Sequence, residues 1–259
     1  MHFAKKLFVG GNWKCNNTLK DSRNIVDTVL AKLKFNPDKV DVAVFPNALH
    51  ITEVLARNSN KGLHVGSQNI SPIGFGAFTG ETSHLHLSDL GIHWTLIGHS
   101  ERRQFYGETD EVVANKTKFA LDNKFGVVLC VGESLAEREG KKTLDVIGNQ
   151  LQTVNNKLGD KKIWKDIVIA YEPVWAIGTG KVATPDQAQE VHKWVRGWLT
   201  GLVGEDHSNA TRIIYGGSVT EKNCKELIEQ PDIDGFLVGG ASLKPAFIDI
   251  VDAVAKAAE

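Results

Sequence analysis

Eight short apolar runs recur along this chain of 259 residues, and they constrain its fold more than any other feature. They occupy residues 7–12, 40–45, 63–67, 94–98, 126–131, 167–171, 212–215 and 235–238. Most lack polar alternation, which is typical of strands buried on both faces of a parallel sheet. Segments with helical periodicity lie between most of the runs. The pattern therefore predicts an α/β fold in which strands and helices alternate through right-handed crossovers.

Eight strand–helix units without an intervening linker favour a single-domain (β/α)8 barrel with eight parallel strands. We expect this one domain to span residues 1–259, because barrels of this type have about 250 residues. The competing architecture is an open, doubly wound sheet, which predicts a glycine-rich dinucleotide turn after the first strand. The sequence GGNWK, from Gly10 to Lys14, does not form that turn.

Capping residues place two helix starts. Thr184 can cap a helix, Pro185 suits its first position, and Gln187 completes a capping box. Thr18 followed by Asp21 marks another start in the same way.

One connection is irregular. The stretch of residues 68–83, from Gln68 to Ser83, has no helical period but carries glycines and two apolar side chains, Phe75 and Phe78. Structureless segments of this length are usually functional or packed against another surface. We therefore expect a docked loop, with a floppy surface loop as the alternative.

Charge and cysteine content narrow the classes of function and location. The chain has 30 basic and 31 acidic residues and so lacks a footprint for nucleic acid or for an anionic membrane. Its cysteines, Cys15, Cys130 and Cys224, have neither CxxC nor metal-ligand spacing. Sparse cysteines, together with the lack of a signal-peptide core or a membrane-length apolar segment, favour a reducing, cytoplasmic location.

The run at 167–171 delivers Glu172 to the carboxyl end of a buried strand. Pro173 disfavours a helical conformation at Glu172, and Gly178 allows backbone angles that are closed to other residues. A carboxylate on a rigid strand end, beside a loop that carries Trp175, fits a general base beneath a moving lid. An acidic strand end followed by an ordinary glycine turn is the alternative.

Other polar residues follow strands that end on the same face of such a barrel, where active sites of this fold lie. Asn12 and Lys14 follow the first predicted strand, and His99 and Glu101 follow the fourth. Taken singly, a strand-end histidine is more often structural and a lysine is more often on the surface. Together with Glu172 they predict a catalytic rim.

Glycine pairs follow the last two predicted strands. Gly216 and Gly217 precede Ser218 after the seventh, and Gly239 and Gly240 follow the eighth. Glycines at strand-to-helix turns let backbone N–H groups approach an anion, and barrels of this kind bind phosphate at these two places. With Gly178 on the neighbouring loop, the pattern predicts a site for a phosphate monoester.

These candidate residues lie in segments that resemble those of the triosephosphate isomerase family. The segments that carry the resemblance span nearly the whole chain: NWK at 12–14, GHSERR at 98–103, YEPVWAIGTGK at 171–181, YGGS at 215–218 and LVGGAS at 237–242. The resemblance implies a TIM barrel that interconverts dihydroxyacetone phosphate and D-glyceraldehyde 3-phosphate through an enediolate, in glycolysis and gluconeogenesis. It implies no metal and no organic cofactor.

The resemblance also implies roles for the candidate residues. Glu172 would move the carbon-bound proton, and His99 would donate to the carbonyl oxygen as a neutral imidazole, kept so by a helix N-terminus. Lys14 would balance the charges of the phosphate and the enediolate, Asn12 would hold the substrate, and Glu101 would orient this network.

The phosphate would be bound by Gly178, Ser218, Gly239 and Gly240. Residues 173–181, including Trp175 in a supporting role, would close over the substrate and exclude water.

In this family the loop equivalent to residues 68–83 docks near the equivalent of Cys15 in a second subunit, so the resemblance implies a homodimer. A bulky thiol reagent on Cys15 should then dissociate it. The chain departs from the family directly after this loop, because His84 stands where proline is common and Leu85 and His86 are also unusual. The departure concerns the interface and not the candidate catalytic residues.

Two other functions stay open at the level of sequence. A barrel kept for adhesion or for binding phosphometabolites would not need the full set of strand-end residues. A Schiff-base aldolase would use Lys14 as its nucleophile.

Overall fold

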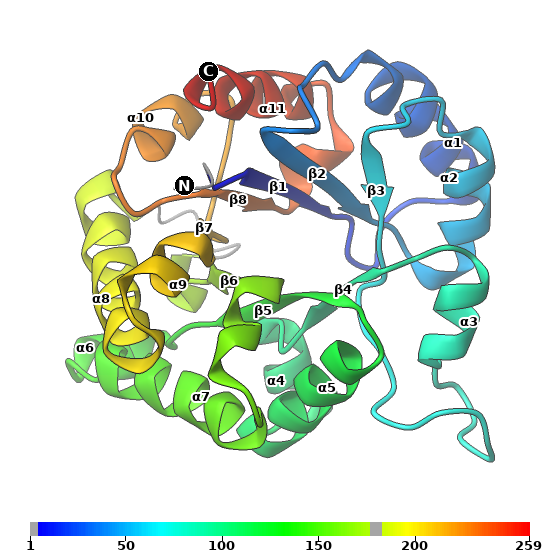
Figure 1. Ribbon diagram of the computed structural model, residues 1–259. Helices are drawn as coiled ribbons and strands as arrows, with labels where there is room; N and C mark the ends of the chain where they lie inside the picture. Colours follow the sequence, from blue (N-terminus) through cyan, green and yellow to red (C-terminus); the bar gives the residue numbers. More distant parts are fainter. Residues whose placement is uncertain (1–4, 177–182) are drawn as a thin grey trace.

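The computed structural model describes residues 5–176 and 183–259. Across those residues, eight parallel strands form one sheet in the order β3-β2-β1-β8-β7-β6-β5-β4 (Figure 1). The strands are β1 (Leu7–Asn12), β2 (Val40–Phe45), β3 (Leu63–Val65), β4 (Trp94–Ile97), β5 (Gly126–Val131), β6 (Ile167–Tyr171), β7 (Arg212–Tyr215) and β8 (Gly235–Val238). The predicted (β/α)8 barrel is confirmed.

The barrel closes between β3 and β4 through a short seam. Ser67 forms an isolated parallel bridge with Thr95. The Ser67 N–H donates to the Trp94 carbonyl oxygen, and the Leu96 N–H donates to that of Ser67, both at 2.9 Å. The expected third and fourth strands, 63–67 and 94–98, are longer than β3 and β4, because the pairing at their carboxyl ends consists of this bridge instead of a continuous ladder.

Helices surround the sheet (Figure 1). The α-helices are α1 (Leu19–Thr28), α2 (Ile51–Arg57), α3 (His84–Asp89), α4 (Ser100–Tyr106), α5 (Asp110–Asp122), α6 (Leu135–Glu139), α7 (Thr143–Lys157), α8 (Pro185–Val203), α9 (Glu205–Ala210), α10 (Cys224–Ile228) and α11 (Ala246–Ala257). Short 3-10 helices lie at Leu30–Lys32, Ala48–His50, Lys161–Asp166, Val174–Ala176 and Gly240–Leu243. The predicted capping boxes at Thr18 and Thr184 are both present.

Two apolar clusters fill the molecule, one between sheet and helices and one inside the barrel. The inner cluster takes alternate residues of the strands, including Val168 and Ala170 of β6. Because side chains alternate between the two faces of a strand, Glu172 continues the inward row at the carboxyl end of β6. Asn12 continues the inward row of β1 in the same way, two residues after Gly10. The strand period thus directs both polar side chains into the mouth of the barrel.

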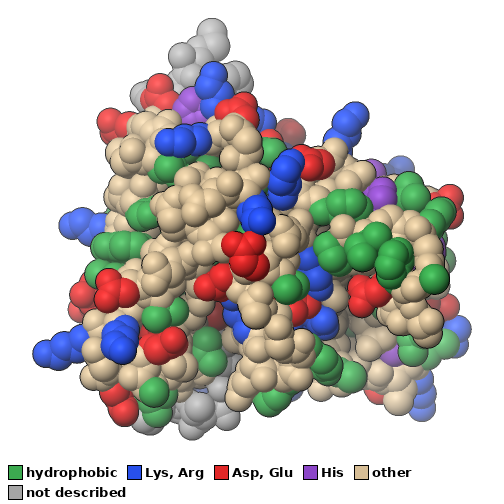
Figure 2. All heavy atoms as spheres, turned by 90° about the horizontal axis from the view of Figure 1, so that it is seen from below, with side chains coloured by type: hydrophobic (Ala, Val, Ile, Leu, Met, Phe, Trp, Pro, Cys, Tyr) green, Lys and Arg blue, Asp and Glu red, His purple; other side chains and the backbone are tan. Residues whose placement is uncertain are grey.

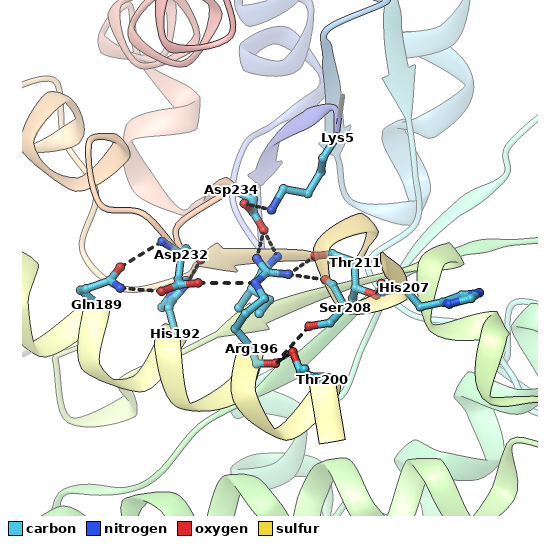
Figure 3. A network of polar contacts seen from close by, with 11 residues as sticks. Lys5, Gln189, His192, Arg196, Thr200, His207, Ser208, Thr211, Asp232 and Asp234 are labelled. Carbon is cyan, nitrogen blue, oxygen red and sulfur yellow. Dashed lines mark hydrogen bonds and ion pairs between the residues drawn. The ribbon is translucent and has the colours of Figure 1, made fainter. Parts of the chain in front are cut away.

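Arg196 ties α8 to the wall of the barrel (Figure 3). Its guanidinium forms an ion pair with Asp234 at 2.5 Å and donates to the carbonyl oxygens of Ser208, at 2.6 Å, and Thr211, at 2.5 Å. Lys5 reaches the same Asp234 carboxylate from the start of the chain. Paired and hydrogen-bonded charges can be buried at little net cost, whereas an isolated charge cannot. The network fixes α8 and α9 beside the strands that lead to the glycine pairs.

The loop of residues 68–83 contains neither helix nor strand and ends at Ser83, which caps α3. Ser71 N–H donates to the Thr82 carbonyl oxygen at 2.9 Å and joins its two arms. The loop protrudes from the barrel beside α3 (Figure 1). Phe75 is 64% exposed and Phe78 39%, and Figure 2 shows apolar side chains gathered over this part of the surface. The described residues leave both rings partly exposed, so the loop has the apolar character of a docking surface.

Candidate active site

The carboxyl ends of the strands surround a cavity of about 1550 Å³. The residues singled out by sequence that line it are Asn12, Lys14, His99, Glu101, Glu172, Trp175, Gly216, Gly217, Ser218, Gly239 and Gly240. Gly178 lies outside the described residues, as does most of the predicted lid at 173–181. The structure therefore brings every described candidate into one cavity, although these residues are far apart in sequence.

Glu172 is the most enclosed acidic group of the cavity, with 2% of its surface exposed. Its Oε1 lies 2.9 Å from His99 Nε2, and its Oε2 accepts the backbone N–H of Ser100 at 3.0 Å. Burial alone would raise the pKa of this carboxyl group, but His99 and the Ser100 N–H outweigh burial and hold the pKa below its usual value. Glu172 is therefore ionised at neutral pH and ready to accept a proton.

His99 directly precedes α4, and its ring lies close to the carboxylates of Glu172 and Glu101. Its Nδ1 accepts the backbone N–H of Glu101 at 3.2 Å, which leaves the ring proton on Nε2, directed at Glu172. Burial lowers the pKa of His99, but the Glu172 carboxylate outweighs burial, so the pKa lies above its ordinary value. This direction is opposite to the effect expected from a helix N-terminus, because a carboxylate at 2.9 Å acts more strongly than a helix end.

Lys14 reaches the cavity from a turn directly after β1. Its backbone is left-handed, with φ 53°, and its N–H donates to Asn12 Oδ1 at 3.0 Å. Its ammonium forms an ion pair with Glu101 at 2.6 Å. The side chain also passes Gly239, where a Cβ would lie 3.7 Å from Lys14 Cε. A fixed positive charge thus stands beside the glycine turn that follows β8.

The turn after β7 requires glycine for steric reasons. A Cβ on Gly217 would clash with the hydroxyl oxygen of Tyr215 and would lie 2.9 Å from Pro173 Cγ. The backbone there packs directly against the strand end and against the residue that follows Glu172. Ser218 comes next and lines the cavity. The turns after β7 and β8 thus form the wall of the cavity near Lys14.

Glu133 is a site residue that the sequence analysis missed. It is fully buried, and its Oε1 accepts hydrogen bonds from Trp175 Nε1 at 3.0 Å and Tyr171 Oη at 3.2 Å. Arg138 forms an ion pair with the same oxygen at 3.0 Å and lies over the Trp175 ring. The same strand-end rule that selected Glu172 would have found Glu133, because it follows β5 directly after Gly132. It anchors Trp175, at the entry to the predicted lid, to the barrel wall.

Residues 5–176 and 183–259 lack the features of two other classes of function, metal centres and helical membrane proteins. No group of three or more His, Cys, Asp or Glu side chains is arranged to hold a metal ion in this part of the chain. None of the helices described combines the length and apolar character that a membrane span requires.

Comparison with known proteins decides the family. The family model described as triosephosphate isomerase matches residues 7–254. The chain belongs to the triosephosphate isomerase family. The resemblance carried by the five sequence segments is confirmed, and with it the TIM barrel fold and an isomerase activity.

Individual relatives of the triosephosphate isomerase family match nearly end to end. Triosephosphate isomerase of Neurospora crassa is 50% identical over 250 residues, which cover 96% of this chain and 99% of the relative. That of Emericella nidulans is 51% identical over 251 residues, covering 96% and 98%. The rice protein named cytosolic triosephosphate isomerase is 49% identical over 249 residues, covering 96% and 97%. These matches do not favour a non-catalytic barrel or an aldolase.

Proposed function

We propose that this chain interconverts dihydroxyacetone phosphate and D-glyceraldehyde 3-phosphate, in glycolysis and gluconeogenesis, with Glu172 as the general base. The observation that carries the proposal is the pairing of a buried, ionised carboxylate with His99 Nε2 at 2.9 Å. The pair lies in the same cavity as the ammonium of Lys14 and two glycine turns. A base, a hydrogen-bond donor and an anion site on one rim are the groups that this isomerisation needs.

Glu172 removes the proton from the carbon beside the substrate carbonyl and later returns a proton to the neighbouring carbon. The C–H bonding pair forms the carbon–carbon double bond of the enediolate, and the second pair of the C=O bond moves to the carbonyl oxygen, which takes up the negative charge. To reach the substrate, the carboxylate gives up its hydrogen bonds to Ser100 and His99. Its ionised form then stands in a mostly buried site without those partners, which makes it a stronger base.

His99 donates its Nε2 proton to the carbonyl oxygen as charge develops there. Its Nδ1 already accepts the Glu101 N–H, so the neutral ring presents a donor at Nε2. When Glu172 turns toward the substrate, the contact that raises the pKa of His99 is weakened, and burial then favours the neutral ring. Glu101 orients His99 through its backbone N–H and Lys14 through its carboxylate.

Lys14 and the glycine turns hold the phosphate. The ammonium balances the charges of the phosphate and of the enediolate, and the Asn12 side chain holds the Lys14 turn and faces the substrate. Ser218 offers a hydroxyl donor, and the backbone at Gly239 and Gly240 accommodates the phosphate oxygens.

The remaining contact from Gly178 and the closure of residues 173–181 belong to the same proposal, although residues 177–181 lie outside the described part of the chain. Trp175 supports the start of this segment through its bond to Glu133, and closure excludes water from the enediolate. The groups named here carry out the chemistry without a metal or an organic cofactor.

Turnover in deuterated water tests the reaction itself. An enediolate mechanism brings deuterium to carbon 2 of D-glyceraldehyde 3-phosphate formed from unlabelled dihydroxyacetone phosphate, because the abstracted proton exchanges on Glu172. Mass spectrometry or NMR of the product measures the label. Folded protein that shows no conversion, or product without any deuterium, contradicts the proposal.

The aldolase alternative is tested by borohydride trapping of substrate on Lys14. The geometry argues against it, because the Lys14 ammonium is ion-paired with Glu101, whereas a Schiff-base lysine needs an unpaired neutral amine.

We further propose that two copies of the chain associate through the loop of residues 68–83. Apolar Ile73, Phe75 and Phe78 are exposed on it. A small cavity of about 390 Å³ lies within the loop, and Cys15 is exposed after β1. A second copy that places Cys15 in that cavity would cover the exposed rings.

Sedimentation before and after modification of Cys15 with a bulky thiol reagent tests this arrangement. We expect a dimer that dissociates on modification. A dimer of unchanged mass after confirmed modification refutes it.

The unusual residues after the loop shape its packing. The His86 ring lies 4.9 Å from Phe75, and the His84 ring lies 5.0 Å from Phe119 on α5. His86 also accepts the Ser83 N–H at 3.1 Å and completes the cap of α3. Leu85 is 41% exposed. These side chains support the proposed interface loop from behind and lie outside the catalytic cavity.

We infer that residues 1–259 form one domain that works in the cytoplasm. The family match runs from residue 7 to residue 254, and the rice relative is named cytosolic. Cell fractionation with an antibody to the chain tests the location.

A further inference from the structure

The backbone of Lys14 is held on both sides by side-chain amides. Its left-handed φ of 53° is unfavourable for a residue with a Cβ, so the turn needs support from its surroundings. Asn12 Oδ1 accepts the Lys14 N–H at 3.0 Å. On the other side, Gln68 Nε2 donates to the Lys14 carbonyl oxygen at 2.8 Å. The peptide groups that orient the lysine are therefore fixed by residues from two distant parts of the chain.

Gln68 braces more than this one turn. The same Nε2 donates to the carbonyl oxygen of Phe45 at 2.9 Å, and that oxygen also accepts the Trp13 N–H at 3.1 Å. The backbone of Gln68 follows Ser67, which is bonded to β4 at the seam of the barrel. One amide group thus connects the ends of β1 and β2 to the closing point of the sheet.

Gln68 does not line the catalytic cavity, and of the two residues whose carbonyl oxygens accept from its amide, Lys14 lines the cavity and Phe45 does not. From the braced turn, the Lys14 side chain extends past Gly239 to Glu101, with its Nζ 2.6 Å from the Glu101 carboxylate. A rotation of the Lys14 peptide would swing this long side chain away from the glycine turn after β8.

We propose that Gln68 is a positioning residue that holds the Lys14 ammonium at the phosphate site. This assignment rests on the proposed function, in which Lys14 balances the substrate phosphate. The contact between ammonium and phosphate is made in the substrate complex and in the transition state alike, so its weakening raises KM more than it lowers kcat. Glu172 and His99 are held by β6 and α4, which Gln68 does not contact through its amide.

Two substitutions test the brace. Gln68→Met removes the donor with little change in length, and Gln68→Glu replaces it with an oxygen that repels both carbonyl groups. We expect KM to rise about tenfold in each, as for the loss of one oriented charged contact, with kcat within about threefold of the unmodified enzyme. The inhibition constant of inorganic phosphate should rise in parallel with KM.

Gln152→Glu is the matched control. Gln152 lies on the exposed face of α7, where it donates to Asn156 at 2.7 Å, so the same change of amide to carboxylate occurs away from the cavity. KM, kcat and the phosphate constant should stay unchanged in this variant.

The pH dependence of Gln68→Glu separates positioning from general damage. A protonated carboxyl group can donate to one of the two carbonyl oxygens, whereas a carboxylate cannot. The two carbonyl oxygens that face the introduced group disfavour the carboxylate, so its pKa should lie above the ordinary value of about 4.3. The ratio of the KM of Gln68→Glu to that of the unmodified enzyme should therefore fall as the pH is lowered toward this pKa, while the ratio for Gln68→Met stays flat.

Unchanged KM and phosphate binding in folded Gln68→Met would overturn the proposal. Equal losses in kcat and in phosphate binding, together with a lower melting temperature, would also overturn it, because they indicate a purely structural role. Calorimetric titration with inorganic phosphate does not depend on turnover. A chain without isomerase activity would defeat the proposed function, whereas weaker phosphate binding in Gln68→Met but not in Gln152→Glu would still support the brace.

Discussion

The two ends of the barrel use charged residues in opposite ways. At the amino ends of the strands, Arg212 forms an ion pair with Asp41 at 2.5 Å and lies over the rings of Phe8 and Trp94. Lys6 reaches the same Asp41. At the carboxyl ends, the charged side chains stand around a cavity of about 1550 Å³.

The difference shows that the arrangement of charged residues, and not their number, distinguishes a catalytic site from a structural ion-pair cluster. The groups of the amino end satisfy one another and close the barrel with aromatic and ionic contacts. At the carboxyl end, a low-pKa carboxylate, a histidine that donates to it and a lysine on a strained turn all face the same space. In this fold, chemistry is expected at the carboxyl end and stability at the amino end.

The largest effect is expected for Glu172→Asp at the carboxyl end. The shorter side chain withdraws the carboxylate by about 1 Å, and a misplacement of that size costs on the order of a hundredfold in kcat. The free energy of unfolding should change little by comparison. Steady-state kinetics and urea unfolding measure the two, with Glu226→Asp on the surface of α10 as the control. Near-normal kcat would remove Glu172 from its proposed role.

At the amino end, Arg212→Met should reduce stability and leave the kinetics intact. It removes the ion pair of a mostly buried Asp41 and the contact with two rings, and we expect a loss of about 2 kcal/mol in the free energy of unfolding. Arg57→Met is the matched control. Its pair with Asp27 is exposed to solvent, so its loss should change the free energy of unfolding much less. Altered kcat or KM in Arg212→Met would contradict the division between the two ends.

The pH profile of His99→Asn sharpens the electrostatic contrast. Burial raises the pKa of Glu172, and His99 helps to hold that pKa below its usual value. Removal of the His99 imidazole should therefore raise the pKa of Glu172. The base is active when ionised, and therefore the acid limb of kcat/KM should move to higher pH. The position of this limb is measured from kcat/KM of the purified variant as a function of pH. An unmoved limb would mean that His99 does not set the charge state of Glu172.

The smallest effect is expected for Ser218→Ala. One neutral hydroxyl donor to the phosphate is lost, so KM should rise about threefold, with kcat nearly unchanged. Ser88→Ala, on the exposed face of α3, should leave both constants as they are. If KM does not change in Ser218→Ala, the hydroxyl does not bind the phosphate.

The sequence predicted the elements and the rim because both follow local rules. Buried strands are apolar runs, and the residue after a strand lies at its carboxyl end, so Asn12, His99 and Glu172 could be placed on one face before any coordinates. Cys130 belongs to the apolar run at 126–131 and is fully buried. The glycines after β7 were selected for an anion, whereas the structure also gives Gly217 a steric reason in its approach to Tyr215.

The features that were not predicted depend on distances between remote segments. The direction of the pKa of His99 follows from a carboxylate delivered by another strand. Gln68 was noted only as the first residue of a loop, and its two hydrogen bonds arise from the way β1 and β2 end beside it. Glu133 could have been found by the strand-end rule, but its contact with Trp175 could not.

The seam at Ser67 has a consequence for the motions of the barrel. Within the described residues, β3 and β4 meet through one bridge instead of a ladder, so the amides of Ser67 and Leu96 should exchange with solvent deuterium sooner than those of β5 and β6. Such breathing would carry Gln68 away from Lys14 and leave Glu172 in place. On warming, substrate binding would then weaken at a lower temperature than that at which proton transfer is lost.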